Sequence, residues 1–154
     1  MLDSNHLSET VAGVGADWLE KVGYPADYSL ESLDRLDELV AEYGPGWGPI
    51  WDEPLDGPKF RRHKPLIKRL YALGCYIGEA LRRQYGGAWF LPQSGEPKTV
   101  MFATLEFPNG AQVDPVWALT QRLRHGWSVA SFVRAAAAFA EGRVEGGECG
   151  GAAT

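Results

Sequence analysis

Residues 73–91 read LGCYIGEALRRQYGGAWFL, and the pattern of this stretch changes from helical to extended partway along. Up to Tyr85, apolar residues recur every three or four positions, a spacing typical of an amphipathic helix. Gly86 and Gly87 then predict the end of that helix, because glycine readily takes the left-handed conformation that closes a helix. The apolar and aromatic residues 88–91 predict a strand. A helix that leads directly into a sheet is therefore expected at the centre of the chain.

The central helix is expected to extend over about 61–85. Gly74 and Gly78 lie four residues apart on one side of it, and in a soluble helix such a pair predicts the close approach of another element. Cys75, between them, is predicted to be buried and unreactive. The main apolar face is expected to comprise Leu66, Leu70, Leu73, Ile77 and Leu81.

Three short strands are expected from this helix onward. An Asn109-Gly110 pair between two apolar runs is a strong signal for a β-hairpin. Together the apolar runs predict a small antiparallel three-stranded sheet, with strands over 88–91, 99–107 and 111–114.

Two helices are expected after the sheet, over about 115–126 and 128–141. Asp114 suits the N-cap of the first helix, and Pro115 suits its first helical position. Ser128 suits the N-cap of the second.

Two more helices are expected before the central one, over about 6–22 and 29–43. Ser29 is the predicted N-cap of the second, and Gly44 is its predicted stop. The segment 44–58 contains four prolines and four glycines and is expected to be irregular, but its large apolar side chains predict that it packs against the body of the protein.

These patterns predict a single α+β domain over 1–141, with about five helices packed on the sheet in the order α-α-α-β-β-β-α-α. The last residues, 142–154, include five glycines and are expected to form a disordered tail. The first residues lack the basic and apolar regions of a signal peptide, and the uncharged run 70–78 is too short to cross a bilayer. The chain is therefore expected to be cytoplasmic.

The net charge of −5 is unevenly distributed along the chain. Residues 1–60 hold 13 acidic and 3 basic groups, whereas residues 61–99 hold 2 acidic and 8 basic groups. One interpretation is that the acidic segment lies against the basic one in the fold. The alternative is that the basic cluster binds nucleic acid or another anion, although nucleic acid is the less favoured partner at a pI of about 5.2. The cluster comprises Arg61, Arg62, Lys64, Lys68 and Arg69.

No motif in the sequence indicates a cofactor or a metal ion. Neither the three histidines nor the two cysteines, Cys75 and Cys149, have the spacing of metal ligands, and a disulfide between the cysteines is not expected. No glycine-rich phosphate loop follows a strand, and no serine sits in a nucleophile elbow. We therefore expect neither cofactor nor metal.

The remaining candidates for catalysis are polar residues around the junction of helix and sheet. A buried carboxylate beside an arginine would form an acid/base pair. Each candidate also has a simpler structural role: Glu79 would pair along its helix with Arg82 and Arg83, Asn109 would form the turn, and Asp114 would cap the next helix. The candidate catalytic residues are Glu79, Arg83, Glu106 and Asp114.

Several stretches of the chain resemble a group of small uncharacterised bacterial domains. The similar segments are 27–37, 73–83, which contains Tyr-Ile-Gly-Glu, and 86–89, which reads Gly-Gly-Ala-Trp. The Pro-Asn-Gly turn at 108–110 and the Asp114-Pro115 pair also match, so that the resemblance covers about 27–135. Some similar domains look like immunity or accessory proteins, and the group implies no established activity or catalytic residue.

The leading functional hypothesis is a non-enzymatic, immunity-like or accessory protein that binds another protein through an acidic surface containing tryptophan. Such a surface would suit a basic partner. A small hydrolase- or transferase-like enzyme that uses the carboxylate and arginine candidates is the first alternative. Anion binding through the 61–69 basic cluster is the second. The predicted partner-binding residues are Asp34, Asp37, Glu38, Trp47, Trp51, Asp52 and Glu53.

Overall fold

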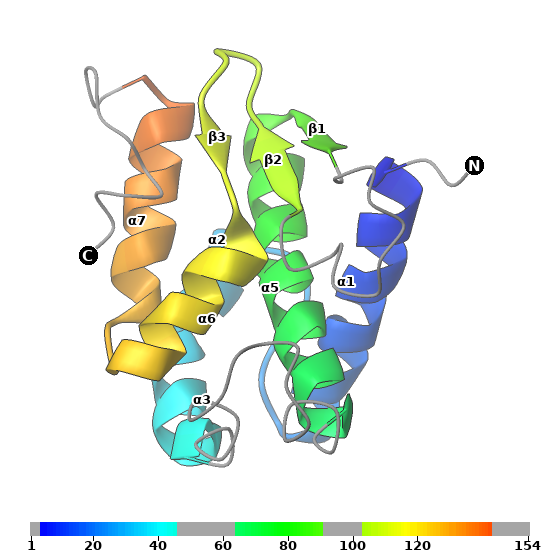
Figure 1. Cartoon of the computed structure of the whole chain (residues 1–154), viewed down its shortest axis with the longest axis vertical. Helices are drawn as coiled ribbons and strands as arrows, with labels where there is room; N and C mark the ends of the chain where they lie inside the picture. The colour runs from blue at the N-terminus through cyan, green and yellow to red at the C-terminus, as the bar shows by residue number, and fades with distance from the viewer. Residues whose placement is uncertain (1–3, 46–63, 91–102, 143–154) are drawn as a thin grey trace.

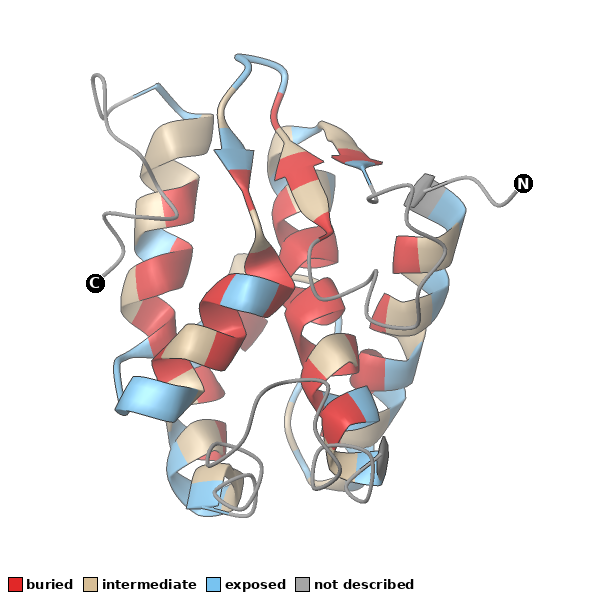
Figure 2. Cartoon of the chain, in the orientation of Figure 1, coloured by how far each residue is buried: buried red, intermediate tan, exposed pale blue. Residues whose placement is uncertain are grey.

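Helix α5, Lys64–Tyr85, runs through the centre of the computed structural model, which describes residues 4–45, 64–90 and 103–142 (Figure 1). Every residue from 72 to 81 is buried, so this part of α5 is covered on all sides (Figure 2). The buried surface of α5 is therefore wider than the predicted apolar face, because it includes every side of the helix over 72–81. Because one stretch of α5 is surrounded by other elements, any charged residue within it must find its partners inside the protein.

Helix α1, Ser4–Lys21, packs along α5 and confirms the first predicted helix. The two helices approach closely because Gly15 faces the backbone of Ala72, where a side chain would meet the Ala72 carbonyl group. Farther along the pair, the Arg69 guanidinium lies 5.8 Å from the centre of the Trp18 ring. The helices therefore run antiparallel, and their small residues set the distance between them.

The single helix expected over 29–43 is wrong, because the chain forms two helices there. Helix α2, Leu30–Asp34, and helix α3, Leu36–Tyr43, meet at Arg35, whose φ of −92° and ψ of 1° interrupt the helix. Ser29 is the N-cap of α2, as predicted, and its Oγ accepts a hydrogen bond from the backbone N–H of Ser32. Gly44 follows α3 in a right-handed conformation, with φ of −55°, so it does not form the expected left-handed stop.

The sheet consists of β1, Ala88–Phe90, β2, Thr104–Glu106, and β3, Gln112–Val113, in the order β1-β2-β3. Both pairs of neighbouring strands are antiparallel, as the sequence predicts. Trp89 faces Leu105, which faces Val113, and all three are buried. One row of side chains across the sheet therefore enters the core, because alternate residues of a strand point to opposite faces.

The predicted hairpin joins β2 to β3. Gly110 has a φ of 88°, and the side-chain oxygen of Asn109 accepts a hydrogen bond from the N–H of Ala111. The Nδ2 of Asn109 also donates to the carbonyl groups of Phe139 and Ala140 at the end of helix α7, Val129–Ala140. The turn therefore also donates to two carbonyl groups in the last turn of α7, where such groups lack an intrahelical partner four residues on.

Helix α6, Pro115–His125, and helix α7 complete the described fold. Ser128 caps α7 as predicted, and Gly126 closes α6 with a φ of 71°. Asp114 occupies the N-cap position of α6, but its carboxylate accepts a hydrogen bond from Thr104 Oγ1, at 2.6 Å, instead of capping the helix. The predicted capping role of this side chain is therefore wrong, because a closer partner on β2 takes it.

The described residues form an α+β fold with six helices and one antiparallel three-stranded sheet, which confirms the predicted class. One helix more than expected precedes the sheet because 29–43 is divided. Within the described part of the chain, no helix has both the length and the apolar character needed to cross a membrane. Nearly all of the predicted loop 44–58 and tail 142–154 lies outside the described residues.

Candidate functional site

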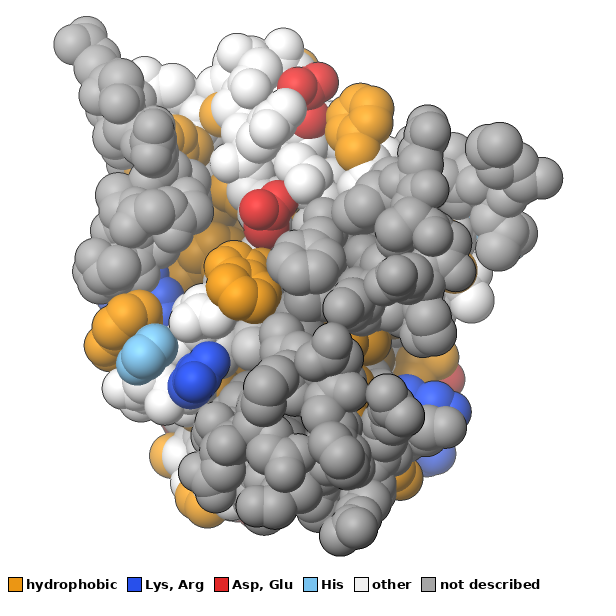
Figure 3. Space-filling model, in the orientation of Figure 1, with side chains coloured by type: hydrophobic (Ala, Val, Ile, Leu, Met, Phe, Trp, Pro, Cys, Tyr) orange, Lys and Arg blue, Asp and Glu red, His pale blue; other side chains and the backbone are white. Residues whose placement is uncertain are grey.

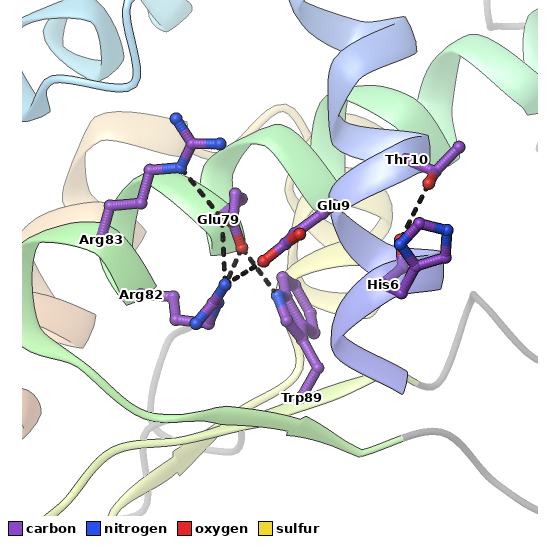
Figure 4. A network of polar contacts seen from close by, with 7 residues as sticks. All are labelled: His6, Glu9, Thr10, Glu79, Arg82, Arg83 and Trp89. Carbon is purple, nitrogen blue, oxygen red and sulfur yellow. Dashed lines mark hydrogen bonds and ion pairs between the residues drawn. The ribbon is translucent and has the colours of Figure 1, made fainter. Parts of the chain in front are cut away.

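The buried carboxylate of Glu79 is the centre of the most extensive polar network in the described residues (Figure 4). Its side chain is 1% exposed. The Nε of Arg82 donates to it at 2.9 Å, the Nε of Arg83 at 3.0 Å and the indole N–H of Trp89 at 3.1 Å. The predicted pairing of Glu79 with both arginines along α5 is confirmed.

The network joins three elements that are distant in the sequence. Arg82 also binds the carboxylate of Glu9, which lies on α1, and Trp89 lies on β1 (Figure 4). Trp89 is buried, and its ring lies against Gly78 on α5. We call Glu9, Glu79, Arg82, Arg83 and Trp89 the Glu79 cluster. It ties the central helix to α1 on one side and to the sheet on another.

The surroundings of Glu79 favour its charged form. Burial alone would raise the pKa of this carboxyl group, but the hydrogen bonds from Arg82, Arg83 and Trp89 outweigh burial and hold the pKa below the usual 4.5. Hydrogen bonds and the negative charge of Glu79 in turn raise the pKa of Arg82. A carboxylate that stays ionised, with both oxygens bonded, has neither a proton to donate nor a free lone pair aimed at a substrate. The Glu79 cluster therefore fits a structural role.

The thiol of Cys75 lies one turn before Glu79 on α5 and is fully buried. Burial, together with the charge of Glu79, raises the pKa of this thiol to about 12. The thiol is thus protonated at neutral pH, and a protonated thiol is a poor nucleophile. Cys75 is buried as predicted, whereas Cys149 lies outside the described residues.

The guanidinium group of Arg83 lies over the ring of an aromatic residue that the sequence did not single out. Its Cζ is 3.7 Å from the centre of the Tyr28 ring, which is close enough for a cation–π interaction. Tyr28 has a φ of 63°, an unusual value for a bulky residue, and its N–H donates to the Tyr76 hydroxyl at 3.1 Å. That hydroxyl is 2.7 Å from the Oγ of buried Ser32. These contacts fix the position of Tyr28 and, through it, that of Arg83.

The outer half of the Arg83 guanidinium remains open. The side chain is 51% exposed, and its two Nη nitrogens make no hydrogen bond to any residue that the structure describes. In Figure 4 these nitrogens point away from the other residues of the Glu79 cluster. Arg83 is therefore held at its Nε and on its ring-facing side, while its terminal N–H groups face outward.

The other two candidate catalytic residues do not join the Glu79 cluster. Glu106 accepts a hydrogen bond from Gln112 Nε2 at 2.8 Å, and Asp114 is bound to Thr104. Of the four predicted residues, the structure brings together Glu79 and Arg83 in direct contact. Since Glu79 is saturated with hydrogen bonds, this pair provides no acid or base for catalysis.

The predicted acidic partner-binding residues have different surroundings in the fold. The carboxylate of Asp37 is bonded to the start of α7, where it accepts hydrogen bonds from Ser128 Oγ and from the N–H groups of Val129 and Ala130. Glu38 forms an exposed ion pair with Arg35 at 3.1 Å. Asp34 is exposed, whereas Trp47, Trp51, Asp52 and Glu53 lie outside the described residues.

Replacing Asp37 with alanine is expected to lower the free energy of unfolding by about 2 kcal/mol, the range of a strong helix cap with charged hydrogen bonds. The substitution leaves the first N–H groups of α7 without this acceptor. Chemical denaturation measures the effect, and Glu38→Ala, which removes an exposed carboxylate, is the control. Equal stability of the two variants would contradict the role of Asp37 at the start of α7.

Additional exposed carboxylates lie near Tyr28. Asp27 precedes it in the chain, and hydrogen bonds from Ser29 lower the pKa of this carboxyl group. Burial raises the pKa of the Tyr28 phenol, and the positive charge of Arg83 opposes this rise. Negative charges, including that of Asp17, raise the pKa further. Asp17, on α1, therefore lies within electrostatic reach of the Tyr28 ring. Three residues apart on α2, Glu31 and Asp34 share one side of that helix. We call the exposed side chains of Asp17, Asp27, Glu31 and Asp34 the acidic surface.

The basic cluster is only partly described. Lys68 and Arg69 are exposed on α5, and Arg69 packs against Trp18. Arg61, Arg62 and the side chain of Lys64 lie outside the described residues. The interpretation that acidic and basic segments meet in the fold holds for Glu9 and Arg82.

Another face of the molecule exposes aromatic side chains. Figure 3 shows hydrophobic side chains at the surface over β1 and α6, among scattered charged ones. Phe90, Trp117 and Trp127 are each between 36% and 50% exposed, and His125 stacks on Trp127 with the ring centres 4.4 Å apart. The described residues therefore expose aromatic side chains on β1, on α6 and just after α6, at positions that the sequence did not single out.

Possible metal ligands are not grouped in the described residues, where no set of three or more His, Cys, Asp and Glu side chains could hold an ion. His6 is exposed near the start of α1, and His63 lies outside the described residues. Comparison of the chain with protein-family models, with curated proteins and with solved structures gave no match in any of the three. Any function is therefore inferred from the side chains themselves.

Proposed function

We propose that this chain is a protein-binding protein of the cytoplasm whose acidic surface receives a basic partner. The observation that carries the proposal is a set of four exposed carboxylates, of which Asp27 adjoins Tyr28 and Asp17 lies within electrostatic reach of its ring. The two arginines of the Glu79 cluster are already paired with buried Glu79. The negative charge of the acidic surface therefore persists next to a well-fixed aromatic side chain. Surfaces with one sign of charge attract partners of the opposite sign and speed their association.

A binding role is favoured over a catalytic one because both carboxylate oxygens of buried Glu79 already accept hydrogen bonds within the protein. Glu79 stays ionised, and Cys75 stays protonated. An accessory or immunity-like role, which the sequence resemblance implies, would need a surface of this kind for a basic partner such as a nuclease. The sequence-based prediction that Trp47 and Trp51 add aromatic anchors stays a prediction.

The proposal is tested by capturing partners from the native lysate with the wild type and with a triple variant, Asp27→Asn, Glu31→Gln and Asp34→Asn. We expect the variant to recover about tenfold less of a basic protein, because several exposed charges act together at a complementary interface. Recovery by the wild type should also fall as the salt concentration rises.

A second triple variant, Glu141→Gln, Glu145→Gln and Glu148→Gln, is the matched control, since it changes the net charge by the same amount elsewhere in the sequence. It should capture the partner as well as the wild type does. If both triple variants recover the same protein equally, or if recovery does not respond to salt, the acidic surface is not the binding site.

A further inference from the structure

Arg83 presents a positive, geometrically fixed group beside the acidic surface. Its Nε is held by Glu79, and its Cζ lies over the Tyr28 ring, 3.7 Å from the ring centre. The side chain has therefore already lost much of the freedom that an exposed arginine normally gives up on binding. Its outward Nη groups are left as donors in a rigid fork.

A carboxylate is the group that such a fork recognises best. The two outer nitrogens of a guanidinium can each donate to one oxygen of a carboxylate, in a planar arrangement that a lysine cannot reproduce. A ligand with a carboxylate alone would be repelled by Asp17, whose charge acts on the Tyr28 ring as that of Arg83 does, and by Asp27, which precedes Tyr28 in the chain. The pattern of charges, positive at Arg83 and negative around it, fits a ligand with the inverse pattern.

We propose that Arg83 binds a carboxylate of the protein partner, and that Lys or Arg side chains flank this carboxylate and contact the acidic surface. This inference rests on the proposed function and specifies the chemistry of the partner's contact segment. Tyr28 acts here as a positioning residue, because it holds the guanidinium plane without contacting the carboxylate. Arg83 then distinguishes the partner from cationic proteins that lack an acidic residue at this point.

The test uses two peptides with blocked ends, Lys-Lys-Asp-Lys-Lys and Lys-Lys-Asn-Lys-Lys, so that the aspartate is the sole carboxylate. Each is titrated into the full-length protein at low salt and followed by NMR, including the Nε–H resonance of Arg83. Overall charge favours the asparagine peptide, since it is more positive and the protein carries a net charge of −5. We expect the reverse, with the aspartate peptide bound about threefold more tightly, the scale of one well-placed exposed ion pair.

Two variants assign the preference to Arg83. Arg83→Gln should abolish it, so that the asparagine peptide binds at least as well as the aspartate peptide, and Arg83→Lys should weaken it because the fork is lost. Lys68→Gln removes a positive charge elsewhere on α5 and should keep the preference. Thermal unfolding of each variant checks that the fold is retained, and the preference of the wild type can be measured without any variant.

The outcomes separate this inference from the proposed function. If both peptides bind the wild type but the aspartate peptide has no advantage, the role of Arg83 is overturned while the acidic surface stands. A preference that persists in Arg83→Gln also overturns it. If neither peptide binds at low salt, the proposed acidic binding surface fails, and the role of Arg83 fails with it.

Discussion

Gly78→Ala is expected to lower the free energy of unfolding by about 3 kcal/mol, at the upper end of the usual range for overpacking a core. A Cβ at this position would overlap the indole ring of Trp89 and would lie 2.8 Å from Cγ of Pro115. The ring cannot easily move aside, because it is buried and its N–H is bound to Glu79 at 3.1 Å. Urea denaturation measures the loss.

Gly13→Ala is the matched control for this substitution. Gly13 also lies within a helix, but nothing is within 4 Å of a Cβ placed there. Since alanine favours the helix more than glycine does, Gly13→Ala should raise the free energy of unfolding by roughly 0.5–1 kcal/mol. If Gly78→Ala were as stable as Gly13→Ala, the close packing of β1 against α5 would be refuted.

Glu79→Ala is expected to have an effect of similar size, a loss of roughly 3 kcal/mol, because it leaves buried polar groups without their partner. The indole N–H of Trp89 would lose its acceptor, and Arg82 would keep only Glu9 among the partners described above. Glu79→Gln should lose less, since an amide oxygen can still accept a hydrogen bond. Glu38→Ala, in an exposed ion pair, should change stability by no more than about 0.5 kcal/mol.

The pH dependence of stability provides a second measurement of the same carboxylate. The pKa of Glu79 is lower in the folded protein than its usual 4.5, the value expected for the unfolded chain. The ionised form therefore stabilises the fold fully above pH 4.5, and this contribution is lost as the pH falls through the folded-state pKa. The stability difference between wild type and Glu79→Gln should narrow below pH 4.5. A difference independent of pH would contradict the ionised state of Glu79.

Much of the fold follows from local pattern. Helices α1 and α5, the hairpin at Asn109-Gly110 and the Ser29 and Ser128 caps depend on residues within a few positions of one another. Their physical causes, helical periodicity, turn conformation and hydrogen bonds to the nearest N–H groups, act over the same short range. The break at Arg35 was not predictable, because the apolar spacing of the segment continues through it.

Part of the candidate site could also be predicted from the sequence. The pairing of Glu79 with Arg82 and Arg83 follows from their spacing on one helix. The positive φ of Tyr28 could not be predicted from the sequence, because residues in the left-handed region are usually glycine or asparagine. Asp37 likewise resembles an ordinary exposed acid of a helix, and nothing near it in the chain indicates that it caps another helix.

Local pattern thus determines the class of the fold, the order of most of its elements and both ends of α6 and α7. Tertiary packing alone decides which side chains meet: Trp89 with Gly78 and Glu79, Glu9 with Arg82 and Tyr28 with Arg83. The reason is physical. A hydrogen bond such as that from the Val129 N–H to Asp37 joins residues 92 positions apart, and its partner is set by how whole helices pack rather than by neighbouring residues.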